Sequence, residues 1–177
     1  YFVVEDFYSS NECEEIVNEI DAMIIEHKEK VWVDENHSDH RLHAADRKSP
    51  IIRKFYEDKF IRSLGANYMD SDLTGFTLAA RLEHKANNLG SGGGWHRDSI
   101  KKQIKAIVYL TDVSSENGPF QYFKKSHLNN AKIGNFLNNT FKHHTRYTES
   151  EVEELESKGM VTFEAKAGTL LLVDTSG

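Results

Sequence analysis

The fold class is decided by the stretch Gln103-Ile104-Lys105-Ala106-Ile107-Val108-Tyr109-Leu110-Thr111. Side chains alternate along a strand, so Ile104, Ala106, Val108 and Leu110 share one wholly apolar face that must meet a dry core. The opposite face is mixed and carries Lys105, Ile107 and Tyr109. A solvent-facing side would be polar throughout, so the mixed face predicts a strand that lines the inside of a barrel or sandwich.

Other stretches on both sides of this one alternate in the same way. In Phe76–Leu82 the pattern predicts Phe76, Leu78, Ala80 and Leu82 against a dry core, with Thr77, Arg81 and Glu83 turned toward the cavity. Downstream, the turns Asn117-Gly118-Pro119 and Lys166-Ala167-Gly168 separate further predicted strands at Phe120–Phe123, Met160–Ala165 and Thr169–Asp174.

The first part of the chain has helical signals instead. Ser9 and Glu12 form a capping box, and apolar residues at three- and four-residue intervals predict a helix over Ser10–Lys30. Ser49-Pro50 begins a second helical region, and Glu149–Lys158 is a third helix closed by Gly159. Helices followed by strands, with no linker, predict a single α+β domain over residues 1–177 with mainly helical support at 1–70 and a β core at 71–177.

Composition excludes several classes of protein. The 177 residues carry 22 basic and 28 acidic side chains, a net charge of -6, which argues against binding to nucleic acid or to an anionic membrane. The longest apolar runs, Ala106–Leu110 and Leu170–Val173, are too short to span a membrane. The single cysteine, Cys13, excludes an internal disulfide framework and favours a cytoplasmic protein.

One segment has the residues of a metal site. In Gly92-Gly93-Gly94-Trp95-His96-Arg97-Asp98 the alternation of an extended backbone turns His96 and Asp98 to the same side and Arg97 away. One imidazole and one carboxylate can bind a single divalent cation, and a second histidine would complete the facial triad of non-haem iron oxygenases. The alternative is a loop histidine paired with a nearby aspartate.

The segments around this pair resemble a known family. The ordered set is Trp95–Asp98, Val108–Val113, Asn117–Phe120, Ser126-His127 and Gly168–Asp174. This series is similar to the phytanoyl-CoA dioxygenase-like family of Fe(II)/2-oxoglutarate-dependent oxygenases. Lys124-Lys125 departs from the Pro-Gly that this family usually has before the Ser-His element.

The resemblance implies a double-stranded β-helix (a jelly-roll or cupin-like fold) with the N-terminal helices packed on one sheet. It implies that His96 and Asp98 bind iron and act in catalysis. The third ligand, a distal histidine, is expected just beyond Gly177, together with an arginine that holds 2-oxoglutarate, so we expect the sequence to be truncated at its C-terminus.

The implied reaction is hydroxylation of a small organic molecule, with decarboxylation of 2-oxoglutarate to succinate and with Fe(II), 2-oxoglutarate and O2 as cofactors and co-substrates. Asp98 favours hydroxylation over halogenation, since the resembled halogenases have a small residue there. Two alternatives remain open. One is a non-catalytic β-helix module that binds a ligand, and the other is a cupin-like metalloprotein with Zn or Ni.

Further site residues follow from the alternation. Arg81, Lys105 and Tyr109 are candidates for cofactor binding, because they are expected to face the cavity. A salt bridge with a neighbour such as Glu83 is the alternative for the cations. Trp95 and Arg97 are expected at the rim of the substrate site.

Two polar stretches do not match a subgroup of the family. Val33–Lys48 is expected to be a loop, with His37, His40 and His43 either in a solvated lid over the site or, less favoured, in a separate metal site. Leu128–Arg146 is a second loop, in which His143-His144 belong to a basic surface patch. Its polar character slightly favours a polar small-molecule substrate. Oligomeric state is not specified by the sequence.

Overall fold

The computed structural model describes residues 1–83, 94–138, 145–157 and 159–177. Its main sheet has three antiparallel strands in the order β1-β8-β5, formed by Phe2–Val4, Leu170–Asp174 and Ile104–Val108. β8 is the central strand, and all five of its residues are buried. The expected strands at Gln103–Thr111 and Thr169–Asp174 are therefore present, whereas β1 had no signal in the sequence.

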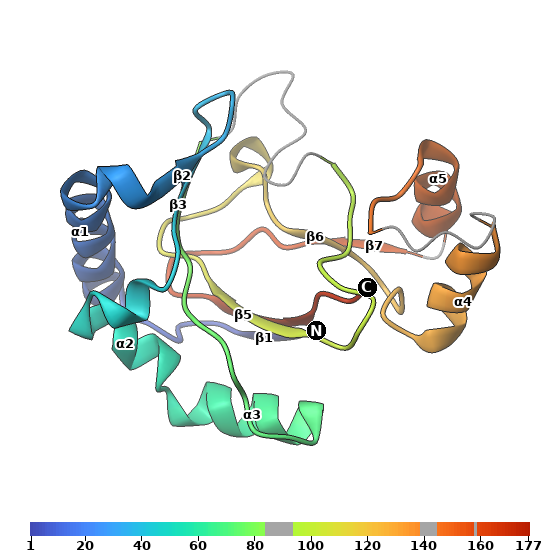
Figure 1. Cartoon of the computed structure of the whole chain (residues 1–177), viewed down its shortest axis with the longest axis horizontal. Helices are drawn as coiled ribbons and strands as arrows, with labels where there is room; N and C mark the ends of the chain where they lie inside the picture. Colours follow the sequence, from blue (N-terminus) through green and yellow to red (C-terminus); the bar gives the residue numbers. More distant parts are fainter. Residues whose placement is uncertain (84–93, 139–144, 158) are drawn as a thin grey trace.

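A second layer lies over this sheet (Figure 1). It consists of the antiparallel pair β6 (Gln121–Phe123) and β7 (Met160–Thr162), which the turn patterns predicted. Ile107 and Tyr109 contact an apolar cluster between the two layers, which contains Tyr122, Phe163, Leu171 and Val173. The prediction that Ile107 and Tyr109 face the inside of a layered β structure is confirmed.

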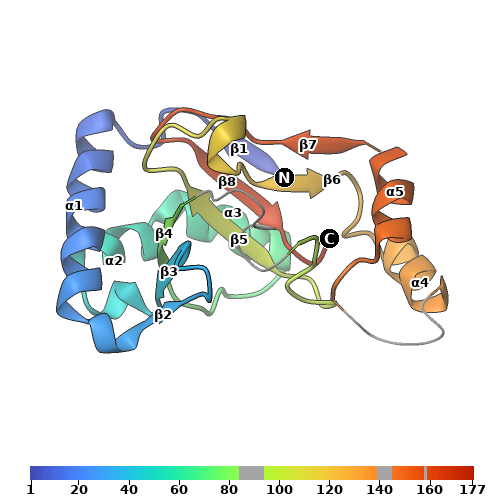
Figure 2. The ribbon, with the colours of Figure 1, turned by 90° about the horizontal axis from the view of Figure 1, so that it is seen from above.

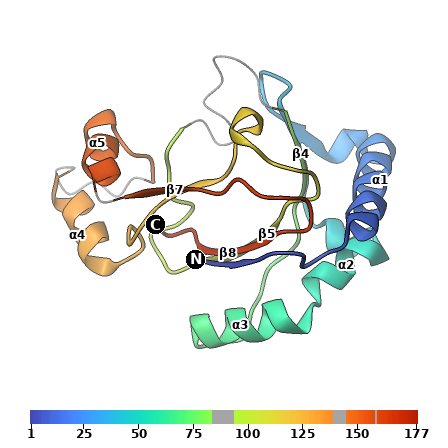
Figure 3. The ribbon, with the colours of Figure 1, turned by 180° about the vertical axis from the view of Figure 1, so that it is seen from behind.

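Helix α3 (Lys59–Met69) covers the other face of the main sheet, as Figure 3 shows from behind. Ile61 of this helix packs with Leu170 and Leu172 of β8, and Ala106 of β5 joins the same cluster. Thus alternate residues of β8 and β5 meet the helix on one side and the second β layer on the other. This arrangement explains why β8 is a continuous apolar run.

The N-terminal helices form at the predicted places. Helix α1 (Ser10–Glu26) begins with the capping box, in which Ser9 accepts from the Glu12 N–H and the Glu12 carboxylate accepts from the Ser9 N–H. A short 3-10 helix, η1 (Lys28–Lys30), follows it. Ser49 caps helix α2 (Pro50–Tyr56), with the proline in the first turn. Figure 2 shows α1 and α2 beside one end of the β layers.

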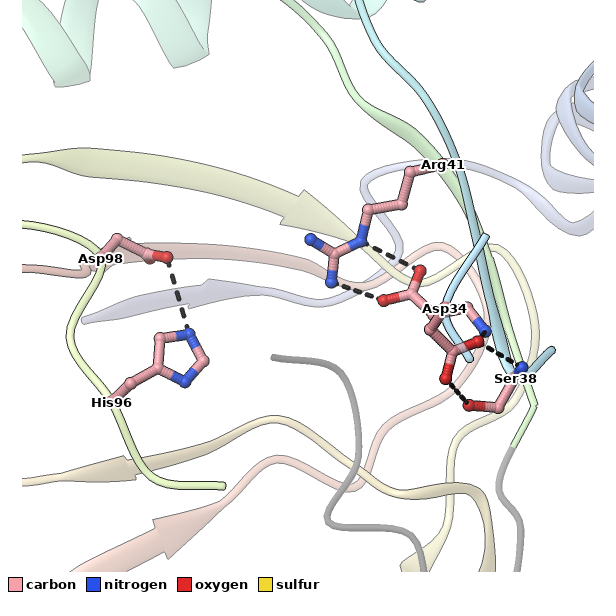
Figure 4. A network of polar contacts seen from close by, with 6 residues as sticks. Asp34, Ser38, Arg41, His96 and Asp98 are labelled. Atoms are coloured by element: carbon pink, nitrogen blue, oxygen red, sulfur yellow. Dashed lines mark hydrogen bonds and ion pairs between the residues drawn. The ribbon is translucent and has the colours of Figure 1, made fainter. Parts of the chain in front are cut away.

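The prediction of a loop over Val33–Lys48 was wrong. This stretch contributes to a second three-stranded sheet, β2-β3-β4, formed by Val31–Val33, Asp39–Leu42 and Ala79–Leu82, and η2 (Ala45–Arg47) follows β3. Asp34 closes the β2-β3 turn by accepting from the N–H groups of Ser38 and Asp39 (Figure 4). The sequence of Val33–Lys48 has no continuous apolar face, so it does not show the alternation that predicts a strand. The hairpin is formed instead by backbone hydrogen bonds between β2 and β3.

The predicted orientation of Phe76–Leu82 was also wrong. Ala79 is the buried residue of β4 and packs in a cluster with α1 and α2. Phe76, Leu78 and Leu82 are instead exposed. The small side chain of Ala79 packs against the helices, so a residue of the face that was expected to line the cavity meets this core instead.

A mainly helical segment connects β6 to β7. It contains α4 (Asn129–Asn138) and α5 (Glu149–Ser157), whereas η3 (Ser115–Asn117) precedes β6. The sequence predicted α5 and its closing Gly159, which has a positive φ of 100°. The loop expected over Leu128–Arg146 was wrong where α4 forms, and His143-His144 lie outside the described residues.

In the described part of the chain, no helix is both long and apolar enough to cross a membrane.

Candidate metal centre

His96 and Asp98 lie next to each other, as the sequence predicted. They belong to a short segment before β5 that forms no regular strand. The imidazole Nε2 of His96 is 3.8 Å from Oδ1 of Asp98 (Figure 4). Both side chains are partly exposed, at 32% and 28%, so a ligand from solvent can reach them.

The two donors fit a metal ion. A cation about 2.1 Å from each of two donors at the right angle of a facial site holds them about 3.0 Å apart, so the two side chains, now 3.8 Å apart, would have to move slightly closer to bind it. Nδ1 of His96 lies 2.8 Å from the carbonyl oxygen of Gly94. A carbonyl only accepts, so Nδ1 carries a hydrogen, and in the neutral ring Nε2 then keeps its lone pair toward Asp98. This is the tautomer that a metal-binding histidine needs.

Lys105 supports the carboxylate from the neighbouring strand β5. Its Nζ lies 2.8 Å from Oδ2 of Asp98, which directs the other oxygen, Oδ1, toward His96. The Lys105 side chain is 43% exposed. Its remaining N–H groups are therefore able to donate to an anionic ligand beside the metal position.

The end of β8 lies directly beside Asp98. The N–H of Asp98 donates to the carbonyl oxygen of Thr175 at 2.9 Å, and the N–H of Thr175 donates to Gln103 at 2.8 Å. The residues that follow β8 thus reach the same place as the two candidate ligands. The Thr175 hydroxyl is buried and has no hydrogen-bond partner within the described ranges.

The two residues predicted at the rim are packed into the protein. The ring of Trp95 stacks on Phe123 with centroids 4.2 Å apart. Arg97 is only 4% exposed, and its guanidinium lies 4.9 Å from the ring centroid of Tyr147 and donates to the phenol oxygen. Both contacts hold the segment on which His96 and Asp98 lie.

The structure does not bring Arg81 to the pair His96–Asp98 by any direct contact. Its side chain is 56% exposed, and its guanidinium forms ion pairs of 3.5 Å with Asp21 and with Glu83. The salt bridge that was the alternative interpretation of Arg81 is therefore present. Arg81 stays only a candidate for cofactor binding.

Tyr109 lies deeper between the layers. Its hydroxyl accepts from the N–H of Phe120 at 2.9 Å. Burial raises the pKa of this phenol, and the hydrogen bond from Phe120 opposes the rise. Tyr109 is thus a neutral group in the apolar cluster between the two β layers.

A polar network fixes the turn after β8. Oδ2 of Asp174 accepts from the Tyr68 hydroxyl at 2.5 Å, and Oδ1 accepts from both the N–H and the hydroxyl of Ser176. Lys132 of α4 donates to the Ser176 hydroxyl at 2.7 Å. Burial acts to raise the pKa of Asp174, but the hydrogen bonds lower it overall, so the carboxylate is ionised.

His127, the other histidine near this turn, is hydrogen-bonded to the protein. The hydroxyl of Tyr122 donates to the carbonyl oxygen of Asp174 and lies 3.0 Å from Nδ1 of His127. Since the phenol has one hydrogen, Nδ1 of His127 must donate to it. Burial lowers the pKa of His127 and keeps the ring neutral.

The histidines of the β2-β3 hairpin do not form a metal site with their neighbours. Within residues 1–83, 94–138, 145–157 and 159–177, no group of three His, Cys, Asp or Glu side chains is close enough to hold a metal ion. His40 lies opposite Arg81 in the β3-β4 ladder, and His43 is near the ring of Phe76. Within these ranges, His96 and Asp98 are two candidate ligands.

Three residues of the site had no functional signal in the sequence. Tyr147 lies 50 positions from Arg97, so no local pattern relates them. In the sequence, Asp174 and Thr175 are simply the polar residues that follow the apolar run Leu170–Val173. A polar pair at the end of a buried strand was the one signal that could have drawn attention to them.

Known proteins share this architecture. The non-heme alpha ketoglutarate dependent epimerase SnoN from nogalamycin biosynthesis is 18% identical, with a TM-score of 0.66 over 98% of this chain and 68% of that one. The epimerase SnoN in complex with Fe3+, alpha ketoglutarate and nogalamycin RO is 16% identical, with a TM-score of 0.62 over 98% of this chain and 69% of that one. HygX from Streptomyces hygroscopicus, with nickel and 2-oxoglutarate bound, is 16% identical, with a TM-score of 0.58 over 99% of this chain and 73% of that one.

No curated protein sequence matches the chain. At these identities the solved structures show a common fold. The family model described as phytanoyl-CoA dioxygenase (PhyH) matches residues 1–176, which is almost the whole chain. The resemblance predicted from Trp95–Asp98 and the segments after it is therefore confirmed: the chain belongs to the phytanoyl-CoA dioxygenase family.

Proposed function

We propose that this protein is a non-haem Fe(II)/2-oxoglutarate-dependent dioxygenase that hydroxylates a small organic molecule. The observation that carries the proposal is the placement of His96 Nε2 and Asp98 Oδ1 3.8 Å apart, each supported by a second hydrogen-bonding partner. Membership of the phytanoyl-CoA dioxygenase family supports the same chemistry. We interpret the layered β core as a double-stranded β-helix within one domain.

His96 and Asp98 would hold the iron, which when bound supplies oxidative chemistry with O2 and 2-oxoglutarate. We propose a distal histidine in sequence after Gly177 as the third ligand. In support, the Thr175 carbonyl bonds to the Asp98 N–H, so a chain continuing from β8 would start beside the other two ligands. An imidazole–carboxylate–imidazole set leaves adjacent coordination positions open.

Lys105 is our first candidate for the anionic end of 2-oxoglutarate or of the substrate. Its ammonium is already fixed against Asp98 and is partly exposed. Ile107 and Tyr109, which follow Lys105 at alternate positions, belong with Phe120 to an apolar cluster that would exclude water from this side of the site. Arg81 is a weaker candidate because two carboxylates already neutralise it.

The substrate is proposed to be a small molecule, in line with the nogalamycin compound bound to SnoN. The polar composition of Leu128–Arg146, where α4 forms, supports a polar small molecule over a long lipid chain. A cytoplasmic location remains a prediction from the single cysteine.

The test is an anaerobic titration of the full-length protein with Fe(II) and 2-oxoglutarate. We expect a weak visible charge-transfer band, and on admission of O2 we expect succinate release that depends on iron. Asp98→Ala should abolish both, because it removes a ligand. Asp112→Ala is the matched control, since this exposed aspartate accepts from Lys166 and Ala167 at a different turn.

Absence of the band and of succinate in the wild-type protein would leave the non-catalytic binding module. Activity with Zn or Ni and without 2-oxoglutarate would favour the cupin-like metalloprotein. Retained hydroxylation in Asp98→Ala would refute the assignment of this ligand.

Epimerisation is a second candidate for the outcome, because SnoN is described as an epimerase and shares this fold. If both outcomes consume 2-oxoglutarate and O2, hydroxylation uses the second oxygen atom on the substrate, whereas epimerisation needs an added reductant such as ascorbate to supply two electrons. Mass spectrometry of the product separates them: hydroxylation adds one oxygen atom, whereas epimerisation leaves the mass unchanged.

A further inference from the structure

In the sequence, Arg97 lies between the two proposed iron ligands, His96 and Asp98. Its side chain is buried although its charge is permanent. A buried guanidinium needs hydrogen-bond acceptors for its N–H groups. Among the residues that the structure describes, no carboxylate lies within ion-pair distance of it. The group that accepts from it is the phenol oxygen of Tyr147.

This contact fixes the guanidinium in two ways. Nε donates to the Tyr147 hydroxyl oxygen at 3.2 Å, and Nη2 donates to the same oxygen. The guanidinium carbon also lies 4.9 Å from the centroid of the Tyr147 ring. A planar group that is held both through its N–H groups and over a ring has little freedom to turn.

The backbones of the two segments are paired as well. The N–H of Arg97 donates to Thr145 at 2.7 Å, and the N–H of Tyr147 donates to Trp95 at 3.1 Å. His96 and Arg146 form the antiparallel bridge between these bonds. The segment Trp95–Asp98 is thus held by backbone pairing with residues 145–147, which lie far away in sequence.

We propose that Tyr147 is a positioning residue for the metal centre. By holding Arg97, it fixes the backbone on both sides of that residue and hence the directions in which His96 and Asp98 present their donors. This inference rests on one part of the proposed function, namely that His96 and Asp98 bind a metal ion.

The test uses Tyr147→Phe in the full-length protein, which keeps the ring and removes the acceptor. Co(II) is the probe, because its binding is measured by calorimetry and by its visible absorption without turnover. We expect about tenfold weaker Co(II) binding, as for other groups that orient metal ligands. In the metal-free protein, we expect faster hydrogen exchange at the amides of Arg97 and Asp98.

Tyr56→Phe is the matched control. Tyr56 forms a similar cation–ring contact with Arg62, whose guanidinium lies 5.3 Å from its ring centroid and donates to the carbonyl oxygen of Leu73, in the α2-α3 region. This variant should change neither Co(II) affinity nor exchange in Trp95–Asp98. Arg97→Lys should weaken Co(II) binding, and adding Tyr147→Phe to it should weaken binding little further, because the two residues act as one unit.

Wild-type Co(II) affinity and exchange in Tyr147→Phe would overturn the proposal, as would fully additive effects in the double variant. Failure of the proposed function is distinguishable. A wild-type protein that binds Co(II) but never consumes 2-oxoglutarate refutes the dioxygenase, whereas the exchange difference at Arg97 and Asp98 would still establish the role of Tyr147.

Discussion

β8 and the segment Trp95–Asp98 meet at the hydrogen bond between Asp98 and Thr175, yet they are held in place by different forces. Every residue of β8 is buried, and its alternate side chains pack into two apolar clusters. Trp95–Asp98 has no regular strand and depends on contacts with Phe123, Tyr147 and Thr175. Burial therefore specifies the strand, whereas specific polar and ring contacts specify the candidate metal centre.

The difference predicts that changes in β8 cost stability, whereas changes around Trp95–Asp98 cost ligand binding. The largest effect is expected for Leu171→Ala, which removes a side chain that is 1% exposed between the two β layers. It should lower the free energy of unfolding by about 3 kcal/mol, as measured by urea denaturation. Leu82→Ala, at a position that is 57% exposed, should cost about 0.5 kcal/mol or less. Equal losses would contradict the burial argument.

Lys105→Met tests the other half of the comparison. We expect KM for 2-oxoglutarate to rise about tenfold, which is about 1.4 kcal/mol, because a cation beside the metal position is lost. The unfolding free energy should change by less than about 1 kcal/mol, since the Lys105–Asp98 pair is partly exposed. Lys166→Met, which breaks the exposed Lys166–Asp112 pair, is the control. An unchanged KM would remove Lys105 from the candidate site.

Thr175→Val sharpens the comparison at the junction of the two regions. The Thr175 hydroxyl is buried without a partner in the described part of the chain, so replacing it by a methyl group should stabilise the protein by about 1 kcal/mol. Thermal unfolding measures this gain. Thr162→Val removes an exposed hydroxyl that accepts from Gln121 and should have little effect. A loss of stability in Thr175→Val would show that the hydroxyl has a partner in solution.

The smallest effect concerns pH. Burial holds the pKa of His127 below the value of about 6.5 that it has in an unfolded chain. As the pH falls through about 6.5, the unfolded chain binds a proton at His127 before the folded protein does, so the free energy of unfolding decreases. Above that pH His127 is neutral in both states, and the protein keeps this part of its stability in full. Comparing urea midpoints at about pH 7.5 and about pH 5.5, we expect His127→Gln to lose less stability than wild type. The exposed His43→Gln should behave as wild type, and an equal loss in all three proteins would refute the assignment.

Local signals explain what the sequence could predict. The Ser9–Glu12 capping box, the Ser49-Pro50 helix start and the alternation at Ile104–Val108 each depend on neighbours a few residues apart, and each is present in the structure. The pairing of His96 with Asp98 belongs to the same class, because two positions on an extended backbone determine it.

Long-range contacts explain what the sequence could not predict. The β2-β3 hairpin follows from backbone hydrogen bonds and the Asp34 turn, not from an apolar pattern. The buried face of β4 depends on how closely α1 and α2 approach Ala79. The contact between Arg97 and Tyr147 joins residues 50 positions apart, which no periodicity reveals.

The strand order β1-β8-β5 has a consequence for synthesis of the chain. β8 pairs on one side with β1, made at the beginning, and on the other with β5, yet among the described strands it is the last to leave the ribosome. Until it arrives, both partner strands have unpaired edges, and the apolar residues that it will cover stay in water. Folding of the main sheet must therefore wait for translation to pass residue 174, and a nascent chain would need protection from aggregation until then.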